Sequence, residues 1–314
     1  MEENYGGFFI EGKDGEKIYL HCWENVNNPK GIIQIFHGMA EHGKRYERFA
    51  KYMNSYGFVV YADDHRGHGQ TAGGIENVGY IGKDGFNNIV EDEHIVGGLI
   101  REKNPELPLV ILGHSFGSFV AQEYMIRYGN EINGVILSGS AAIEGFLVRL
   151  GYTLAAIERF IWGEKKRSYL LDKLTFGSYN KRIKGENLSK FAWLTTDMEE
   201  VHKYEEDPFC GGVFTTGFYY YFFRALLNLY KKERLQNIPK DLPILIISGE
   251  EDPVGEYGVL VRRLYEIYKD SGNILVDIKI YPSKRHEILN EINREEVFED
   301  ILVWLKEKVE DNFS

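Results

Sequence analysis

Cysteine is scarce in this sequence of 314 residues, which has only two, Cys22 and Cys210, far apart along the chain. A scaffold held together by several disulfides is therefore excluded. We expect both cysteines to be free thiols in a reducing compartment, with a single bridge as the alternative. A chain of this length can bury a full hydrophobic core without covalent links.

Long apolar runs and an excess of basic charge are also missing. The best candidate for a membrane span, residues 143–162, is interrupted by Glu144, Arg149, Glu158 and Arg159, and we reject it for that reason. The first five residues lack the basic and apolar segments of a secretory signal, so we expect a cytoplasmic protein. Because 37 Lys and Arg face 48 Asp and Glu, for a formal net charge of -11, nucleic acid is not an expected partner.

The patterns that are present indicate an α/β protein. Short β-branched runs alternate with amphipathic helical patterns over the first 140 residues. The pair Asp14-Gly15, between two such runs, predicts an N-terminal antiparallel hairpin. The later runs predict a mostly parallel sheet with helices on both faces. Its strands are expected at residues 32–36, 58–62, 109–112, 134–137, 243–247 and 274–280.

The alternation stops in the middle of the chain. No proline occurs between Pro108 and Pro208, and residues 141–235 contain no convincing strand pattern. Helical periodicity takes its place over residues 146–161. We interpret this stretch as a helical insertion between two strands of the sheet.

The central motif is Gly113-His114-Ser115-Phe116-Gly117, which matches G-x-S-x-G. It follows a predicted strand directly and begins a helix, which is the context that a nucleophile elbow requires. The helix N-terminus also favours negative charge that develops nearby. The alternative is a glycine-rich turn in which Ser115 only caps the helix, but the context favours the nucleophile.

A serine hydroxyl needs a base that takes its proton. His286 follows the last predicted strand and Asp252 follows the strand before it. The order Ser115, Asp252, His286 is that of α/β-hydrolases, in which the acid holds the tautomer of the imidazole. Glu250 and Glu251 are rivals of Asp252, and each loop residue could have no catalytic role, but all three in this order favour a triad.

Acyl transfer also requires N–H donors for an oxyanion. We assign the backbone N–H of Phe116, the residue after the nucleophile, and that of Met39 in the loop after the strand at 32–36. Asp64, His65 and His68 suggest a metal site, but the histidine-rich arrangement of metallohydrolases is absent. We therefore assign no metal and no cofactor.

Several segments together resemble the monoacylglycerol lipase / lysophospholipase group of serine α/β-hydrolases. The resemblance runs in order from about Ile32 to the C-terminus. It departs at Met39, where this group often has a smaller residue, so the pocket is expected to be narrower. The matching segments are residues 37–42 with Arg45 and Tyr46, residues 64–69, residues 113–117, residues 249–254 and residues 285–287.

The resemblance implies an α/β-hydrolase fold in which Ser115 attacks an ester carbonyl, His286 transfers the proton and Asp252 orients His286. It implies a core of residues 1–141 and 231–314 and a helical cap of residues 142–230 that holds an acyl chain. The candidate lining residues of the cap are Phe146, Leu150, Leu154, Phe218, Phe222 and Leu226.

Two features leave alternatives open. Seven of the ten residues 214–223 are aromatic, and they either pack the cap on the core or form a surface that binds an acyl chain or transiently touches a membrane. Glu41 and Arg45 are spaced to form a pair at the start of a helix, which is either a surface ion pair or a device that positions the oxyanion loop.

The leading hypothesis is a serine hydrolase that cleaves esters of monoacyl lipids, either monoacylglycerols or lysophospholipids. A short-chain esterase, a peptidase or an acyltransferase could use the same triad, because the fold alone does not choose among them. A binding protein with a hydrolase fold is the alternative without enzymatic activity. The sequence does not indicate an oligomeric state.

Overall fold

A computed structural model of the chain describes residues 5–185 and 188–309. Residues 1–4, on which the expectation about a secretory signal largely depends, lie outside the described residues. Eight strands form one sheet in the order β1-β2-β4-β3-β5-β6-β7-β8. None of the helices in the described ranges combines the length and the apolar composition that a membrane span requires.

The sheet begins with the predicted hairpin. Strands β1 (Gly6–Glu11) and β2 (Lys17–Trp23) pair antiparallel. Asp14 and Gly15 between them have φ of 58° and 76°, the left-handed conformation that such turns need and that Asp and Gly tolerate. Strand β2 also pairs antiparallel with β4 (Phe58–Asp64), so β2 runs against its neighbours on both sides.

The other strands are parallel, and their apolar sequences explain why. A strand covered by helices on both faces has a nearly continuous apolar sequence, and β3, β5, β6 and β7 are buried along their whole length. The last strand, β8, is half-buried because it lies at the edge of the sheet. The bounds are β3 Gly31–Phe36, β5 Leu109–His114, β6 Gly134–Ser138, β7 Ile244–Gly249 and β8 Val276–Tyr281.

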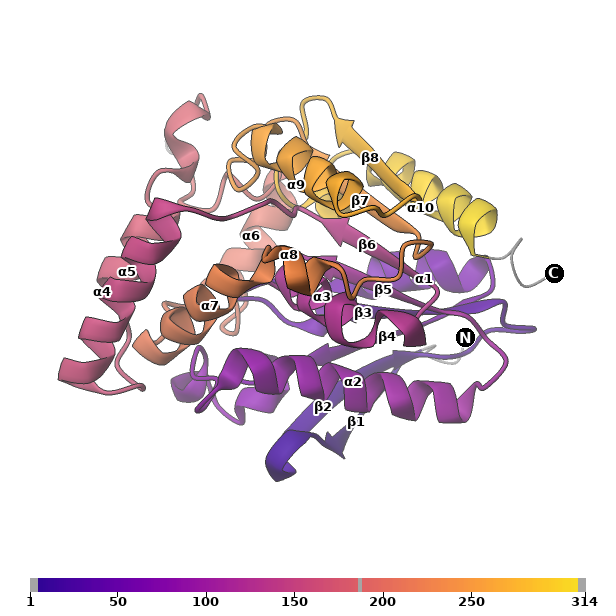
Figure 1. Ribbon diagram of the computed structural model, residues 1–314, viewed down its shortest axis with the longest axis horizontal. Helices are drawn as coiled ribbons and strands as arrows, with labels where there is room; N and C mark the ends of the chain where they lie inside the picture. Colours follow the sequence, from indigo (N-terminus) through magenta and orange to yellow (C-terminus); the bar gives the residue numbers. More distant parts are fainter. Residues whose placement is uncertain (1–4, 186–187, 310–314) are drawn as a thin grey trace.

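Helices cover both faces of the sheet, as the alternation predicts (Figure 1). Helices α1 (Glu47–Ser55) and α10 (Arg294–Lys308) share one hydrophobic cluster with one face. Helices α2 (Gly85–Lys103), α3 (Phe116–Tyr128) and α9 (Val259–Asp270) share a second cluster with the other face. The fold is therefore the mostly parallel α/β-hydrolase sheet with an N-terminal hairpin.

Among the described residues, five α-helices come between β6 and β7, where the sequence predicts an insertion. Figure 1 shows α4 and α5 at the left end of the molecule, with α7 between them and the sheet. The division into a core and a cap at residues 142 and 230 remains a prediction. The helices are α4 (Phe146–Trp162), α5 (Tyr169–Phe176), α6 (Met198–Glu206), α7 (Thr216–Leu229) and α8 (Lys232–Leu235).

The aromatic segment at residues 214–223 belongs mainly to α7, which packs between α4 and the helices α2 and α3. Its N-terminus is capped by the Thr215 hydroxyl, which accepts a hydrogen bond from the Phe218 N–H at 3.3 Å. The rings of Phe218 and Phe116 lie 5.0 Å apart, and those of Phe222 and Phe119 lie 5.4 Å apart. These aromatic residues therefore pack the insertion on the helices of the sheet.

Candidate active site

Ser115 lies at the sharp turn between β5 and α3. Its backbone has φ 50° and ψ -117°, a strained conformation for a residue with a side chain. The turn is tight, because a Cβ on Gly117 would lie 2.0 Å from the Phe36 carbonyl oxygen. Only glycine fits there, so the G-x-S-x-G pattern has a direct steric cause.

Ser115, His286 and Asp252 form a hydrogen-bonded chain. His286 Nε2 lies 2.8 Å from Ser115 Oγ, and His286 Nδ1 lies 2.9 Å from Asp252 Oδ2. Asp252 follows β7 and His286 follows β8, so both lie on loops at the carboxyl edge of the sheet. This is the geometry by which a base activates a nucleophile and an acid orients the base.

Burial separates Asp252 from its two rivals. Asp252 is fully buried, and its carboxylate accepts hydrogen bonds from the Val254 N–H at 2.8 Å and the Ser248 hydroxyl at 3.2 Å. Glu250 is exposed, and the Glu251 side chain is 52% exposed with its nearest cationic partner, Arg285, 4.0 Å away. Neither glutamate has a hydrogen bond to His286 in the described part of the chain.

The two buried histidines at the site have opposite pKa shifts. Burial lowers the pKa of His286, but the charge and the hydrogen bond of Asp252 outweigh it, so this pKa lies above its usual value. Burial and the neighbouring His286 lower the pKa of His114 to about 4. His114 is therefore neutral near pH 7 and lies next to a histidine that can take a proton.

The two proposed oxyanion donors face the same cavity as Ser115. Within the described residues, the backbone N–H groups of Met39 and Phe116 have no hydrogen-bond acceptor. Phe116 is the first residue of α3, where the N–H groups lack partners inside the helix. These two free donors could therefore receive a developing oxyanion.

A buried ion network supports the loop that contains Met39. Glu41 accepts hydrogen bonds from the Gly38 N–H at 2.5 Å and the Tyr46 hydroxyl at 2.9 Å, and it pairs with Arg45. Arg45 also makes two hydrogen bonds to Glu287, at 2.8 and 2.7 Å. The three charged side chains are buried or nearly so, so the pair of Glu41 and Arg45 is not a surface ion pair.

Glu287 lies in the matching segment 285–287, but its sequence context assigned it no role. Burial alone would raise the pKa of its carboxyl group, but the charge of Arg45 and the hydrogen bonds to it lower this pKa to about 2. Glu287 directly follows His286, so the network joins the loop after β3 to the loop that contains the predicted base. The position next to His286 was the available signal, and nothing in the sequence pointed to its partner.

A cavity of about 400 Å³ opens at Ser115 and His286. The insertion supplies much of its wall, and Trp193 lies over His286 with the ring centroids 5.1 Å apart. Leu194 accepts a hydrogen bond from the Glu287 N–H at 2.6 Å. Apolar side chains dominate the lining; they include Met39, Phe119, Ile143, Phe176, Phe191, Trp193, Leu194, Val213, Phe222, Phe223 and Val254.

The structure places the predicted cap residues in different surroundings. Phe222 lines the cavity. Phe218 and Leu226 are buried in the hydrophobic core, away from the cavity wall. Phe146 and Leu150 are exposed on α4, and Leu154 is partly buried against the core. Helical periodicity identified an apolar surface of α4, but that surface does not face the cavity.

The histidine-rich segment after β4 packs under the loop that contains Met39. The ring of His65 stacks on that of His37 with the centroids 4.0 Å apart. The backbone N–H of His65 donates a hydrogen bond to His37 Nε2 at 2.9 Å. His68 packs against Phe116 and Phe214. Through these contacts His65 and His68 brace the loops, and Asp64 accepts hydrogen bonds from two backbone N–H groups.

Comparisons with known proteins agree with this architecture. The family model described as serine aminopeptidase, S33, matches residues 27–293. A monoacylglycerol lipase of Mycolicibacterium smegmatis is 30% identical over 300 residues, which cover 94% of each chain. The human monoglyceride lipase is 25% identical over 304 residues, 94% of this chain and 88% of its own. A thermostable carboxyl esterase of Bacillus coagulans, solved with glycerol, has a TM-score of 0.88 at 29% identity and covers 97% of this chain and 98% of its own.

Proposed function

Because the chain belongs to the family of serine hydrolases described as serine aminopeptidase, S33, we propose that it is a carboxylic ester hydrolase that cleaves monoacyl lipids through an acyl-enzyme on Ser115. The observation that carries this proposal is the chain of hydrogen bonds from Ser115 through His286 to Asp252 at the mouth of an apolar cavity.

The first half of the reaction forms the acyl-enzyme. Ser115 Oγ attacks the ester carbonyl while His286 Nε2 takes the hydroxyl proton. The Asp252 carboxylate stabilises the imidazolium, and the N–H groups of Met39 and Phe116 hold the oxyanion. When the tetrahedral intermediate collapses, the C–O bond to the alcohol breaks and His286 returns the proton to the leaving oxygen.

The second half releases the acid. A water molecule attacks the acyl-enzyme carbonyl and gives its proton to His286, which then returns that proton to Ser115 Oγ as the acyl bond breaks. The same oxyanion donors serve both halves. One base thus handles every proton transfer, which explains why His286 is held on both sides by Ser115 and Asp252.

The cavity supports a substrate with one acyl chain. Its lining is mainly apolar, and burying each methylene group contributes about 0.8 kcal/mol. A monoacylglycerol or a lysophospholipid has one chain to bury. The relatives named as monoacylglycerol and monoglyceride lipases support this class of substrate.

Labelling with a fluorophosphonate probe tests the nucleophile. The wild-type chain should form a covalent adduct on Ser115 and hydrolyse p-nitrophenyl butyrate. The Ser115→Ala variant should remain unlabelled and lose several orders of magnitude in turnover, with an unchanged far-UV spectrum. Ser55→Ala, which changes an exposed serine at the end of α1, is the control. Near wild-type turnover of Ser115→Ala would refute the assignment.

Two other reactions could use the same triad. The family description names an aminopeptidase, and an acyltransferase would pass through the same acyl-enzyme with an alcohol in place of water. A panel of p-nitrophenyl esters, matched p-nitroanilides and added acceptor alcohols separates these reactions. We expect hydrolysis of the esters, whereas faster cleavage of amino-acyl anilides than of esters would favour the peptidase.

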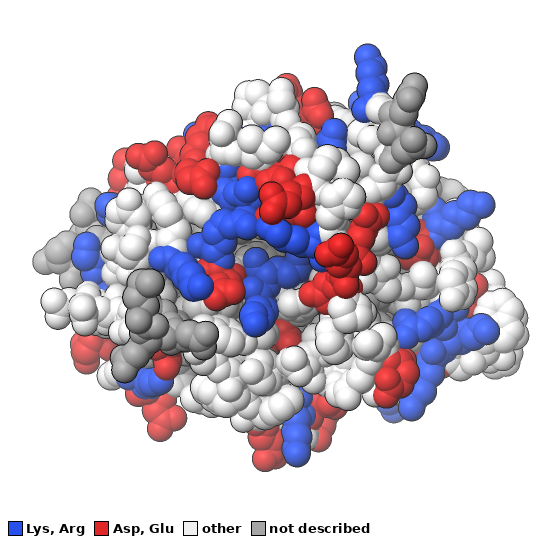
Figure 2. Space-filling view, turned by 180° about the vertical axis from the view of Figure 1, so that it is seen from behind, with Lys and Arg blue, Asp and Glu red and all other residues white. Residues whose placement is uncertain are grey.

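We also propose that residues 142–230 act as a cap whose outer surface transiently contacts a membrane. Helices α4 and α5 expose a row of large apolar side chains, and exposed apolar area of this kind marks interaction surfaces. The face opposite that of Figure 1 carries basic side chains around a hollow, with acidic ones beside them (Figure 2). The exposed apolar residues of these two helices include Phe146, Leu147, Phe160, Ile161, Trp162, Tyr169 and Leu174.

Vesicle flotation tests this contact. The net charge of -11 opposes binding to anionic lipids, so the vesicles should be pure phosphatidylcholine. The double variant Phe160→Ser/Trp162→Ser should float less than the wild type, whereas Ile274→Ser, which changes an exposed apolar residue outside the insertion, should float equally. Equal flotation of all three proteins would contradict the contact.

A cytoplasmic location is the remaining proposal. Both cysteines are free thiols, with Cys22 buried and Cys210 partly buried, which suits a reducing compartment. Fractionation of the source cells, followed by detection with an antibody, tests it. Recovery of the protein in the cytosolic fraction is the expected result, and recovery from a secreted fraction would contradict it.

A further inference from the structure

Outside the triad, the described residues contain three groups of histidine, aspartate and cysteine side chains that lie close enough to share a metal ion. In each group the ligand atoms lie within 4.8 Å of one another. The three groups differ in whether their ligand atoms are available. They are His37 with Asp63 and His65, His21 with His42 and Asp64, and His42 with Asp207 and Cys210.

The first group is fully committed to other bonds. His37 Nδ1 donates to the Gly38 carbonyl oxygen at 2.7 Å, and His37 Nε2 accepts from the His65 N–H at 2.9 Å. His65 Nδ1 lies 3.0 Å from Asp63 and 3.1 Å from Glu93. All of these side chains are buried, so a metal would have to break several buried hydrogen bonds.

Two members of the second group are committed in the same way. Asp64 accepts hydrogen bonds from His21 Nε2 at 2.9 Å, the Gly43 N–H at 2.9 Å and the Gln70 N–H at 2.7 Å. His21 Nδ1 is bonded to the Tyr5 hydroxyl at 2.9 Å. The ligand atoms of His21 and Asp64 are therefore already used in hydrogen bonds, whereas His42 uses Nε2 and has no hydrogen-bond partner for Nδ1 among the described residues.

The third group is less committed than the other two, although the Asp207 carboxylate accepts hydrogen bonds from His42 Nε2 and, at 2.9 Å, from the Phe209 N–H. His42 Nε2 lies 2.9 Å from Asp207 Oδ2, both side chains are partly exposed, and the Cys210 sulfur has no hydrogen-bond partner in the described part of the chain. We propose that His42, Asp207 and Cys210 form a binding site for a borderline-soft divalent cation of the Zn²⁺ class. The ligands supply one nitrogen, one oxygen and one sulfur, a set that suits Zn²⁺.

The spacing fits tetrahedral coordination after small shifts. Zn²⁺ binds nitrogen and oxygen at about 2.0–2.2 Å and sulfur at about 2.3 Å, so ligand atoms end roughly 3.3–3.7 Å apart. Starting from atoms within 4.8 Å of one another, each ligand has to move by about 1 Å or less. Water completes the fourth position, because the group reaches the surface.

Binding requires two proton movements, and both are accounted for. The Cys210 thiol loses its proton to solvent, so one proton is released for each cation bound. The proton on His42 Nε2 moves to Nδ1, which frees the Nε2 lone pair for the metal. No oxidation or reduction takes place.

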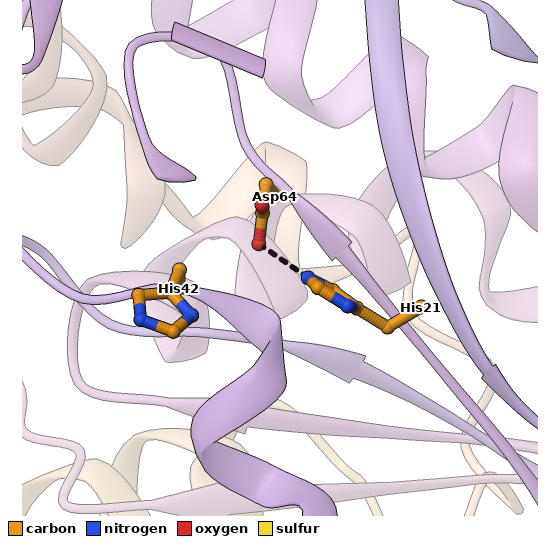
Figure 3. A group of neighbouring side chains, drawn as sticks. All are labelled: His21, His42 and Asp64. Carbon is orange, nitrogen blue, oxygen red and sulfur yellow. Dashed lines mark hydrogen bonds and ion pairs between the residues drawn. The ribbon is translucent and has the colours of Figure 1, made fainter. Parts of the chain in front are cut away.

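The surroundings of His42 suit this tautomer. Figure 3 shows that Nδ1 of His42, the ring nitrogen nearer the backbone, is turned toward the hydrogen-bonded pair of Asp64 and His21. The other ring nitrogen, Nε2, is turned away from that pair. A histidine that binds a metal commonly donates its second N–H to a carboxylate. Asp64 stands on the side where that acceptor is needed.

The site would tie the insertion to the loop beside the catalytic serine. His42 follows Glu41, and Asp207 and Cys210 follow α6 of the insertion. The two segments already meet at Ala40, whose carbonyl oxygen accepts hydrogen bonds from the Gly211 N–H at 3.0 Å and the Tyr204 hydroxyl at 2.8 Å. A bound cation would add a coordinate link to this contact and stabilise the folded chain.

Metal titration of the full, untagged chain after chelator treatment tests the site. Zn²⁺ should bind with a stoichiometry of about one and raise Tm, and Co²⁺ should give a thiolate-to-metal charge-transfer band. Cys210→Ser should lose the band, and Asp207→Asn should weaken binding at least about 10-fold. The matched controls are Cys22→Ala, which removes the other cysteine, and His202→Ala, which removes an exposed histidine of α6.

Two results would overturn the proposal. One is binding that Cys210→Ser and Asp207→Asn leave unchanged, and the other is the absence of a charge-transfer band from cobalt-loaded wild type. Asp207→Asn is nearly isosteric, so it keeps the test valid if Cys210→Ser does not fold. None of the three ligands belongs to the triad, so the result is independent of the ester hydrolase proposal.

Discussion

At the scale of single residues, the active site depends on which acidic side chain is buried. Asp252, Glu250 and Glu251 are adjacent in the sequence, yet only Asp252 points its carboxylate at His286 Nδ1. The acid has to be held by hydrogen bonds in a dry position, because an exposed carboxylate is screened and mobile. Asp252 meets this condition through Val254 and Ser248.

The first prediction compares the three acids. Asp252→Asn keeps the shape of the side chain but removes the charge and favours the wrong tautomer of His286, so kcat should fall by up to about ten-thousand-fold. Glu250→Gln and Glu251→Gln should stay within about twofold of wild type, because both side chains are exposed. Turnover of p-nitrophenyl butyrate measures all three, and a larger loss in Glu251→Gln would mean that the acid is misassigned.

The second prediction concerns pH. His286 accepts a proton only when it is neutral, and its pKa lies above its usual value because of Asp252. The protonated, inactive form therefore persists to higher pH, and the acid limb of kcat/KM should have its midpoint above about 6.5. The rate of fluorophosphonate labelling against pH gives the same midpoint independently.

A matched variant checks the cause of that shift. Asp252→Asn removes the charge that raises the pKa and leaves the burial that lowers it, so the midpoint of the labelling rate should move to lower pH. A wild-type midpoint at or below about 6.5 would contradict the raised pKa.

At the scale of elements, the loop after β3 is held from both sides. Glu41 accepts a hydrogen bond from the N–H of Gly38, one residue before the proposed oxyanion donor Met39, and Arg45 links Glu41 to Glu287, which lies beside the proposed base. Arg45 also lies over the ring of Tyr204 from α6, 4.8 Å from its centroid. One guanidinium therefore contacts the segments that contain the proposed oxyanion donor, the proposed base and part of the cavity wall.

The third prediction tests that positioning role. Arg45→Ala should lower kcat for p-nitrophenyl butyrate and change KM much less, because the proposed oxyanion donors stabilise the transition state rather than the bound ester. Arg45→Lys should restore little activity, because a lysine cannot make the two parallel bonds to Glu287. Steady-state kinetics and Tm are measured together.

The control for Arg45 is a pair with the same spacing on the surface. Lys51 pairs with Glu47 on α1, and both side chains are solvent-accessible, so Lys51→Ala should change neither kcat nor stability by a measurable amount. If Arg45→Ala behaves like Lys51→Ala, the positioning role is refuted.

At the scale of the whole molecule, the cavity exists only because the insertion covers the carboxyl edge of the sheet. Core loops supply Met39, Ser115 and His286, and the insertion supplies Trp193 and Phe222. An open parallel sheet binds ligands at this edge, and covering that edge with apolar helices makes it suitable for an acyl chain. The proposed catalytic groups therefore come from the core of the chain, whereas the insertion supplies much of the cavity wall.

The fourth prediction follows from the size of the cavity. Each added methylene should raise kcat/KM about fourfold, the equivalent of about 0.8 kcal/mol, until the cavity is full, and kcat/KM should then level off or fall. Monoacylglycerols should be preferred over triacylglycerols. The series of p-nitrophenyl acetate, butyrate, octanoate and laurate measures the dependence, and a preference for acetate with no activity on octanoate or monoacylglycerol would indicate a short-chain esterase.

Two variants, assayed with the same series of p-nitrophenyl esters, test where the acyl chain binds. Phe222 lines the cavity, whereas the Phe146 side chain is 76% exposed on α4. Phe222→Ala should shift the preferred chain length, and Phe146→Ala should leave it unchanged. The opposite pattern would place the acyl chain along α4 instead.

The sequence by itself determined the order of the elements and the positions of the triad candidates. Runs such as residues 32–36, which are apolar at every position except Gln34, indicate buried strands, and Ser115, Asp252 and His286 each follow a predicted strand. The carboxyl ends of parallel strands share one edge, so local patterns were enough to bring these residues together. The hairpin at Asp14-Gly15 was equally local, because the turn depends on the backbone preferences of two residues.

Only the tertiary structure decided which side chains surround that edge. Periodicity showed that α4 has an apolar surface, but not that Phe146 and Leu150 face outward while Phe222 faces the cavity. Likewise, no local pattern pairs Arg45 with Glu287 or brings His42 to Asp207. The physical reason is that these contacts join segments more than a hundred residues apart, where the packing of helices, rather than local conformation, sets the distance.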